Sequence, residues 1–218
     1  MQDRVYVWEA PVRVTHWINV ICILALSVTG FYIGNPFLVA RETSAFLMGW
    51  MRFVHFVVAY IFVVNMAVRI YWAFAGNKYA VWQEILPFTG DRMGKLFSHM
   101  SYYAFLGKKP PTELGHTPLA SAGYCIMYAL FALSAVTGFA LYSQPHHHGF
   151  LQFAFGWVFG IVSIPATRLL HHLTMWLIFY FVILHIYLVL FQNSTSKSGI
   201  LGSIFDGYRF VPSKKAGK

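Results

Sequence analysis

Four of the ten histidines lie inside long apolar blocks, where an ionisable side chain is costly and is usually functional. They are His16, His55, His171 and His185. A neutral imidazole binds metal through a ring nitrogen, and two imidazoles can fill both axial positions of a haem iron. Such a pair leaves no open position for oxygen or a substrate. The residue types therefore favour electron transfer over bond-making chemistry.

The fourth apolar block gives the clearest spacing. His171 and His185 are 14 positions apart, so on a helix they lie about 40° from alignment and about 21 Å apart along the axis. One helix face therefore presents an imidazole near each surface of a membrane. His172 points about 140° away from His185 and is not expected to be a ligand.

The partners of these two residues follow from the alternating direction of four helices. His16 begins the first block and is expected at the level of His185, on the inner side. His55 begins the second block, which runs in the opposite direction, and is expected at the level of His171, on the outer side. The sequence thus predicts two bis-histidine haem sites stacked across the membrane.

Three of the four histidines follow an arginine by three residues, which places each arginine and histidine on the same helix face. Arg13, Arg52 and Arg168 are therefore candidates for binding the haem propionates, because arginine forms strong pairs with carboxylates. The related strings LSVTGF and LSAVTGF contain Gly30 and Gly138. These glycines either allow a flat macrocycle to approach or serve as ordinary helix-packing residues.

The composition indicates the kind of elements that position these side chains. Apolar residues make up 58% and charged residues 11% of the 218 residues, whereas a soluble domain carries roughly a quarter charged residues. Apolar residues gather in long blocks, and lipid leaves the backbone of such blocks no hydrogen-bond partner outside a helix or a closed barrel. We therefore predict an all-α integral membrane protein, a four-helix bundle with transmembrane helices at about 15–34, 45–75, 119–142 and 169–191.

The segments between these blocks complete the predicted organisation. Residues 150–165 are aromatic and short for a span, so we interpret them as an interfacial helix rather than a fifth span. An amphipathic helix is expected at 93–106. Residues 1–212 form one domain, followed by a basic tail at 213–218. No cleavable signal peptide is expected before the first span.

The distribution of charge predicts the orientation. The net charge of +9 is not the mark of nucleic-acid binding here, because the basic residues lie between the apolar blocks and near the C-terminus. In a four-span topology, 13 of the 16 basic residues lie on the side of both termini. The positive-inside rule then places both termini in the cytoplasm, for a multi-pass protein of the inner membrane. A fifth span would export the basic tail.

Cysteine usage narrows the type of haem. The two cysteines, Cys22 and Cys125, both lie inside apolar blocks, and the chain contains no CxxCH string. Covalently attached c-type haem is therefore not expected, and the histidine pairs predict two non-covalent haems. The run His146 to His148 is expected to be solvated rather than a metal site.

Beyond these patterns, the chain resembles the b-type cytochrome subunit of membrane-bound uptake nickel–iron hydrogenases over nearly its whole length. The resemblance lies in the strings VWEAPVRVTHW, MRFVHF, RIYWAFAGNKY, ELGHTPLA, VTGFALYS, HHLTMWL, LHIYLVL and DGYRF. The first string is shared with related cytochromes b. The combination of RIYWAFAGN, GHTP and GFALYS is more specific to the hydrogenase branch. One departure is Arg168, where the family carries a further histidine one turn before the ligand of the fourth helix.

The resemblance implies two haems b on the four histidines and two partners, a small subunit with iron–sulfur clusters and a large subunit with the nickel–iron site. This chain would have no hydrogen-activating site and would act as the electron-transfer and quinone-reducing subunit. Electrons would enter at the outer haem and leave from the inner haem to a quinone near the cytoplasmic surface. Polar residues on that side are candidates for the quinone site: Asn77, His99, Tyr102, Glu113 and His116.

Two other functions are weighed against this one. A formate-dehydrogenase or thiosulfate-reductase type of cytochrome b would use the same haem sites, and the RIYWAFAGN and GHTP strings argue for the hydrogenase instead. A haem-free proton-coupled transporter would have broken helices and charges at the membrane midplane. The histidines instead lie toward the ends of the predicted spans, and aspartate and glutamate are absent from their centres.

Overall fold

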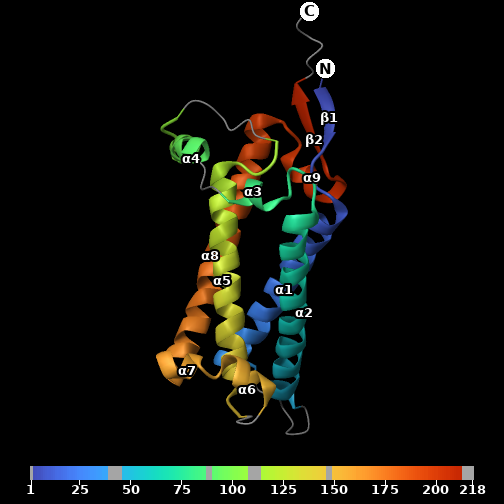
Figure 1. Ribbon diagram of the computed structural model, residues 1–218. Coiled ribbons are helices and arrows are strands. Elements are labelled where there is room, and N and C mark those ends of the chain that lie inside the picture. The colour runs from blue at the N-terminus through green and yellow to red at the C-terminus, as the bar shows by residue number, and fades with distance from the viewer. Residues whose placement is uncertain (1, 39–45, 87–89, 108–113, 146–148, 213–218) are drawn as a thin grey trace, which may run out of the picture.

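Four long helices dominate the computed structural model, which describes residues 2–38, 46–86, 90–107, 114–145 and 149–212. Each helix is long and apolar enough to cross a membrane (Figure 1). This confirms the predicted all-α bundle, and every helix extends somewhat beyond, or closely matches, the predicted bounds. The four helices are α1 (Ala10–Gly34), α2 (Leu47–Ala75), α5 (Pro118–Ser143) and α8 (Ile164–Ser196).

Shorter elements cover the two ends of the bundle. Both chain ends lie at one end, which we call the terminal end, and the opposite end carries α6 and α7 (Figure 1). The amphipathic helix predicted at 93–106 is α4, three residues earlier in the sequence. The shorter elements are β1 (Gln2–Tyr6), α3 (Trp82–Ile85), α4 (Gly90–Tyr103), α6 (Phe150–Phe155), α7 (Val158–Ile161), α9 (Ile200–Asp206) and β2 (Tyr208–Pro212).

Three of the four long helices have a proline in their first turn. Pro118 is the first residue of α5, and Pro11 and Pro165 are the second residues of α1 and α8. Thr117 also caps α5, because its hydroxyl oxygen accepts a hydrogen bond from the Ala120 amide at 3.1 Å. Pro165 therefore lies in the first turn of the last span, whereas the sequence had suggested that it ends the interfacial segment. That segment consists of two short helices, α6 and α7, instead of one.

The bundle is built from two helix pairs. α1 packs along α2, and α5 packs along α8. A small core joins all four helices, and most other large apolar side chains point outward, as expected where the surrounding solvent is lipid. The core side chains are Cys22, Phe62, Met66, Met127, Phe131 and Ile178.

A two-stranded antiparallel ribbon joins the two ends of the chain, and the sequence analysis did not foresee it. In its register Gln2 lies opposite Pro212 and Tyr6 opposite Tyr208. The ribbon explains the DGYRF string. Gly207 has φ of 86°, and its carbonyl accepts hydrogen bonds from the amides of Val7 and Trp8 at 2.8 and 3.0 Å. A side chain at Gly207 would meet the Trp8 carbonyl at 2.6 Å, so glycine is required there.

A partly buried carboxylate ties the first helix to the second at the terminal end. One oxygen of Glu9 accepts hydrogen bonds from the Trp72 indole at 2.9 Å and from the Asn77 amide at 2.7 Å. The Asn77 side chain in turn donates to the Val7 carbonyl at 3.0 Å. The strings VWEAP and RIYWAFAGN therefore meet in space, and these contacts fix the level of α1 against α2.

Candidate functional site

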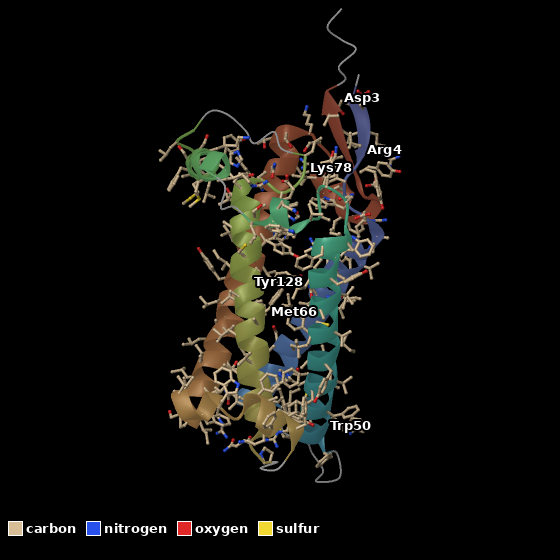
Figure 2. The ribbon with its side chains drawn as sticks, viewed as in Figure 1. Asp3, Arg4, Trp50, Met66, Lys78 and Tyr128 are labelled. Atoms are coloured by element: carbon tan, nitrogen blue, oxygen red, sulfur yellow. The ribbon has the colours of Figure 1, made fainter. Side chains whose placement is uncertain are left out.

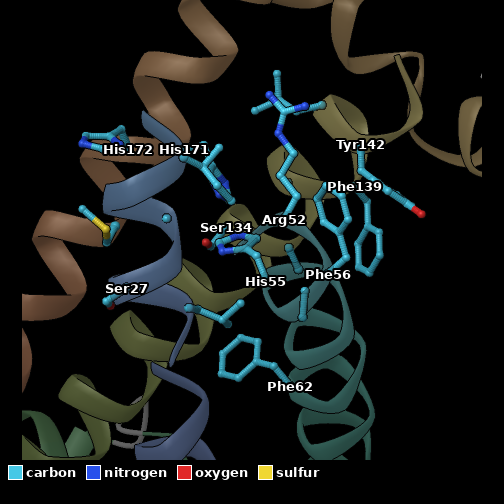
Figure 3. Close-up of a pocket in the computed structure, with 18 of the residues that line it drawn as sticks. Ser27, Arg52, His55, Phe56, Phe62, Ser134, Phe139, Tyr142, His171 and His172 are labelled. Carbon is cyan, nitrogen blue, oxygen red and sulfur yellow. The ribbon is translucent and has the colours of Figure 1, made fainter. Parts of the chain in front are cut away.

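Two of the predicted histidines face one cavity near the α6–α7 end. His55 comes from α2 and His171 from α8, and their ring centres lie 6.5 Å apart. Figure 3 shows both rings in this cavity together with Arg52, Phe139 and Tyr142. The cavity has a volume of about 710 Å³, within the range of cofactor sites, and its walls are mostly apolar.

Each of these two rings is held by a threonine from the neighbouring helix. The Thr29 hydroxyl lies 2.9 Å from Nδ1 of His55, and the Thr137 hydroxyl lies 3.0 Å from Nδ1 of His171. Both hydroxyls donate their own hydrogen to a backbone carbonyl four residues earlier, at 2.7 Å. Each threonine oxygen is then an acceptor toward the ring, so Nδ1 carries the ring hydrogen. The other nitrogen, Nε2, keeps its lone pair free for a metal.

The residue after each threonine is a glycine that makes room for the ring. A Cβ added at Gly138 would lie 3.0 Å from Cε1 of His171, and one at Gly30 would lie 3.4 Å from Cε1 of His55. Both glycines also line the cavity. Each copy of the VTGF string thus contacts one imidazole, through the threonine hydroxyl and the space above the glycine. One copy is on α1 and the other is on α5. The predicted role of the glycines beside a macrocycle stays a prediction.

Replacing Thr137 with valine removes the acceptor from Nδ1 of His171 while keeping the shape of the side chain. We expect a haem held by His55 and His171 to stay bound and its midpoint potential to rise, because the ring becomes a less basic ligand. A redox titration of the haem absorbance measures this shift. Thr174→Val is the matched control, since Thr174 is buried one turn away on α8 and donates to the Leu170 carbonyl at 2.8 Å. Equal shifts in the two variants would contradict the role of Thr137.

The other two predicted histidines meet near the terminal end. The ring of His16 on α1 and that of His185 on α8 have centres 6.4 Å apart. Nδ1 of His16 is buried and has no hydrogen-bond partner among the described residues. Phe181, one turn before His185, stacks on its ring at 6.1 Å with an interplanar angle of 10°. The ring of His185 thus has an apolar neighbour, and no hydrogen bond to a described residue fixes Nδ1 of His16.

The spacing within each pair suits one iron between two imidazoles. A metal–imidazole nitrogen bond is about 2 Å long, so two rings bound to one metal from opposite sides have centres on the order of 6 Å apart. The observed 6.4 and 6.5 Å agree with this value. Two rings packed more closely would leave no room for a metal between them. The observed distances therefore fit bis-histidine binding of one haem by each pair.

The three predicted arginines have different surroundings. Arg52 and Arg168 both line the cavity of His55 and His171, in reach of a ligand there. Arg13 instead donates a short hydrogen bond to the carbonyl of Phe205 and so holds α9 against α1. Its Nε is buried without a partner among the described residues. His172, which was set aside as a ligand, lies against Gly34 and Phe31 of α1 and apart from His171 (Figure 3).

The candidates for a quinone site do not form one cluster. The Asn77 side chain is engaged in the contacts that follow α2, donating to Val7 and accepting from the Tyr79 amide at 3.0 Å. His99 is buried in α4, and Tyr102 on the same helix lies against Phe191 of α8, with ring centres 6.1 Å apart. Glu113 lies outside the described residues.

His116 is the remaining candidate, and it precedes the N-cap of α5. Its ring packs edge-on against Trp8, with centres 4.8 Å apart. Burial, reinforced by the neighbouring positive charges of Arg69 and Arg92, lowers the pKa of His116 to about 4. The imidazole is therefore neutral at neutral pH.

The sequence analysis missed Thr29, Thr137 and a buried arginine, Arg69. The threonines had a visible signal, since both precede the glycine of the repeated VTGF string. Arg69 had a weaker one, the only signal being its place inside an apolar block and inside the RIYWAFAGN string.

A family model and several curated proteins match this chain over nearly its whole length. A family model described as prokaryotic cytochrome b561 matches residues 7–207. Three curated relatives are similar over most of both chains. A probable Ni/Fe-hydrogenase B-type cytochrome subunit of Rhizobium leguminosarum bv. viciae is 40% identical over 98% of this chain and 92% of its own length. That of Cupriavidus necator is 41% identical over 94% and 86%. The probable Ni/Fe-hydrogenase 1 B-type cytochrome subunit of Escherichia coli (strain K12) is 36% identical over 98% and 92%.

Proposed function

Because this chain belongs to the prokaryotic cytochrome b561 family of Ni/Fe-hydrogenase B-type cytochrome subunits, we propose that it carries electrons from a hydrogenase to membrane quinone through two haems b. The observation that carries this proposal is that two histidine pairs lie at opposite ends of the bundle. Both have ring-centre distances suited to one iron. The names of the curated relatives favour the hydrogenase over a formate dehydrogenase or thiosulfate reductase as partner.

The chain's own residues define how each haem would be held. A bound haem b supplies an iron that takes up and releases one electron. His55 and His171 would hold one iron through Nε2, while Thr29 and Thr137 keep the proton on Nδ1. His16 and His185 would hold the second. Two histidine ligands to each iron would leave no position open for oxygen or a small substrate.

The cavity near the α6–α7 end adds charge and apolar cover to the first pair. Arg52 and Arg168 line it and are the residues we assign to the propionates of the outer haem. The largely apolar walls give the two rings surroundings of low polarity, in which the charges of Arg52 and Arg168 would act strongly on a bound group.

The orientation follows from the basic residues around the terminal end. By the positive-inside rule we place this end in the cytoplasm and the α6–α7 end in the periplasm, with the protein in the inner membrane. The iron–sulfur small subunit and the nickel–iron large subunit would then dock at the α6–α7 end, near His55 and His171. Quinone would be reduced near the terminal end, where His99, Tyr102 and His116 remain candidates.

Purification from native membranes tests the function. We expect an affinity-tagged chain to bring down a small and a large hydrogenase subunit, and hydrogen gas to reduce the haem absorbance of the complex. Added quinone should then reoxidise the haem. Reduction by formate but not by hydrogen, with a formate dehydrogenase as the co-purifying partner, would assign the chain to the other type of complex. A well-folded chain without haem would favour the transporter.

A further inference from the structure

A buried guanidinium near the terminal end has no counter-charge in the part of the chain that the structure describes. Arg69 is only 3% exposed, and both of its terminal nitrogens are buried without a hydrogen-bond partner there. The two ion pairs among the described residues join Arg4 to Asp206 and Arg92 to Glu84. Because leaving a buried charge unpaired is strongly destabilising, the surroundings of Arg69 call for an anion.

Helix contacts place Arg69 beside the second histidine pair. The Asn65 amide donates to the Thr15 carbonyl at 2.9 Å, so Asn65 on α2 is level with the residue that precedes His16. Arg69 lies one turn further on the same face of α2, about 6 Å nearer the terminal end. Its side chain therefore occupies the interior just beyond the level of His16.

The opposite wall is formed by α5. The guanidinium lies over the ring of Tyr124, 5.3 Å from its centre, and Tyr124 stacks on Tyr128 at 4.5 Å. Gly123, next to Tyr124, lies against Phe181, the residue that stacks on His185. Figure 2 shows Tyr128 of α5 and Met66 of α2 extending into the space between these helices. Arg69 thus joins the same interior region as both His16 and His185.

Among the described residues, no carboxylate lies within ion-pair distance of Arg69. Arg92 is already paired with Glu84, with 2.6 Å between nitrogen and oxygen. His116 is neutral, for the reasons given above, and supplies no negative charge. Glu9, the carboxylate at the start of α1, accepts from Trp72 and Asn77. An anionic group from outside this set is needed to balance Arg69.

We infer that Arg69 binds a carboxylate of the haem held by His16 and His185. The inference rests on the proposed dihaem function. Arginine matches a carboxylate with two parallel hydrogen bonds, and both terminal nitrogens of Arg69 are available for them. The sequence spacing had suggested Arg13 for this role, but the Arg13 side chain is bound to the carbonyl of Phe205. Arg69 lies on a different helix, about one turn beyond the level of His16.

Reconstitution of the haem-free full chain separates a carboxylate contact from simple packing. Natural haem b and haem b with both carboxylates methylated are titrated into the parent chain, Arg69→Gln and Arg69→Lys. We expect Arg69→Gln to bind one of two natural haems about ten- to a hundredfold more weakly, and Arg69→Lys to recover part of the affinity. With the methylated haem, all three chains should bind alike, because the negative charge is gone.

Two further variants and a redox titration complete the test. Arg4→Gln removes an exposed arginine from the same end, and we expect it to leave the affinity for natural haem unchanged at both sites. In Arg69→Gln saturated with natural haem, one midpoint potential should fall, because loss of a positive charge favours the oxidised iron. Glu113→Gln is expected to leave both haem affinities unchanged. If it reproduces the loss seen in Arg69→Gln, the partner of Arg69 is a carboxylate of the chain itself and the inference is wrong.

The remaining outcomes separate this inference from the proposed function. A parent chain that binds two haems while Arg69→Gln binds both unchanged overturns the role of Arg69 alone. Equal weakening for natural and methylated haem also overturns it, since a packing defect does not depend on the carboxylates. A parent chain that binds no haem overturns the dihaem function and this inference with it.

Discussion

Replacement of His171 with alanine is expected to lower the haem content from two per chain to one. A single imidazole from His55 cannot fill both axial positions of an iron, and the other histidine that lines the cavity, His172, has its ring against Gly34 and Phe31. A pyridine haemochrome spectrum with a protein assay measures the ratio. Transfer of electrons from hydrogen to quinone should be abolished at the same time.

His172→Ala is the matched control for this experiment. His172 is the next residue of the same helix, but its ring lies against Gly34 and Phe31 rather than against His55. We expect this variant to retain two haems. Loss of one haem from His172→Ala together with full retention in His171→Ala would show that the ligand has been assigned to the wrong neighbour.

Replacement of His185 with alanine is expected to trap electrons at the outer site. The variant should lose the haem shared with His16 and keep the one between His55 and His171. In the complex with its hydrogenase, hydrogen should still reduce the remaining haem. Quinone reduction should fall to background, because the two histidine pairs are about 21 Å apart along α8 and the second step has lost its carrier.

The paired spectra and rates check this order of electron flow. Stopped-flow absorbance follows reduction of the remaining haem by hydrogen, and a quinol assay follows the product. In the corresponding outer variant, His55→Ala, hydrogen should reduce the remaining haem much more slowly than it reduces the haems of the parent chain. If His185→Ala retains quinone reduction while His55→Ala retains rapid reduction of the inner haem, the proposed direction is reversed.

The features that depend on the length, direction and periodicity of single helices could be predicted from the sequence. Apolar blocks gave the four long helices, and the alternating helix direction put His16 near His185 and His55 near His171. The rings in the structure do lie together in these pairs, while their role toward haem stays a prediction. Helix periodicity also separated His172 from His171, because neighbouring residues of a helix point about 100° apart.

Contacts between helices were harder to predict, because they depend on how far each helix is shifted along its neighbour. Thr137 can reach His171 only when α5 and α8 have one particular stagger, which no local pattern records. Arg69 reads as one more interfacial arginine until α2 is known to turn that face inward. Arg13 shows the reverse case. Its spacing suggested a propionate partner, whereas α9 brings the Phe205 carbonyl to its side chain.

The ribbon of β1 and β2 constrains how many times the chain crosses the membrane. Its strands pair the second residue of the chain with residue 212, so both ends must be on the same side before the strands can meet. Only an even number of crossings satisfies this condition. A chain that failed to insert α8, or that inserted the α6–α7 segment as an extra span, would leave the two strands on opposite faces of the bilayer. The pairing therefore requires that all four long helices be inserted in alternating directions, and a misinserted chain would keep two unpaired strand edges exposed to association or proteolysis.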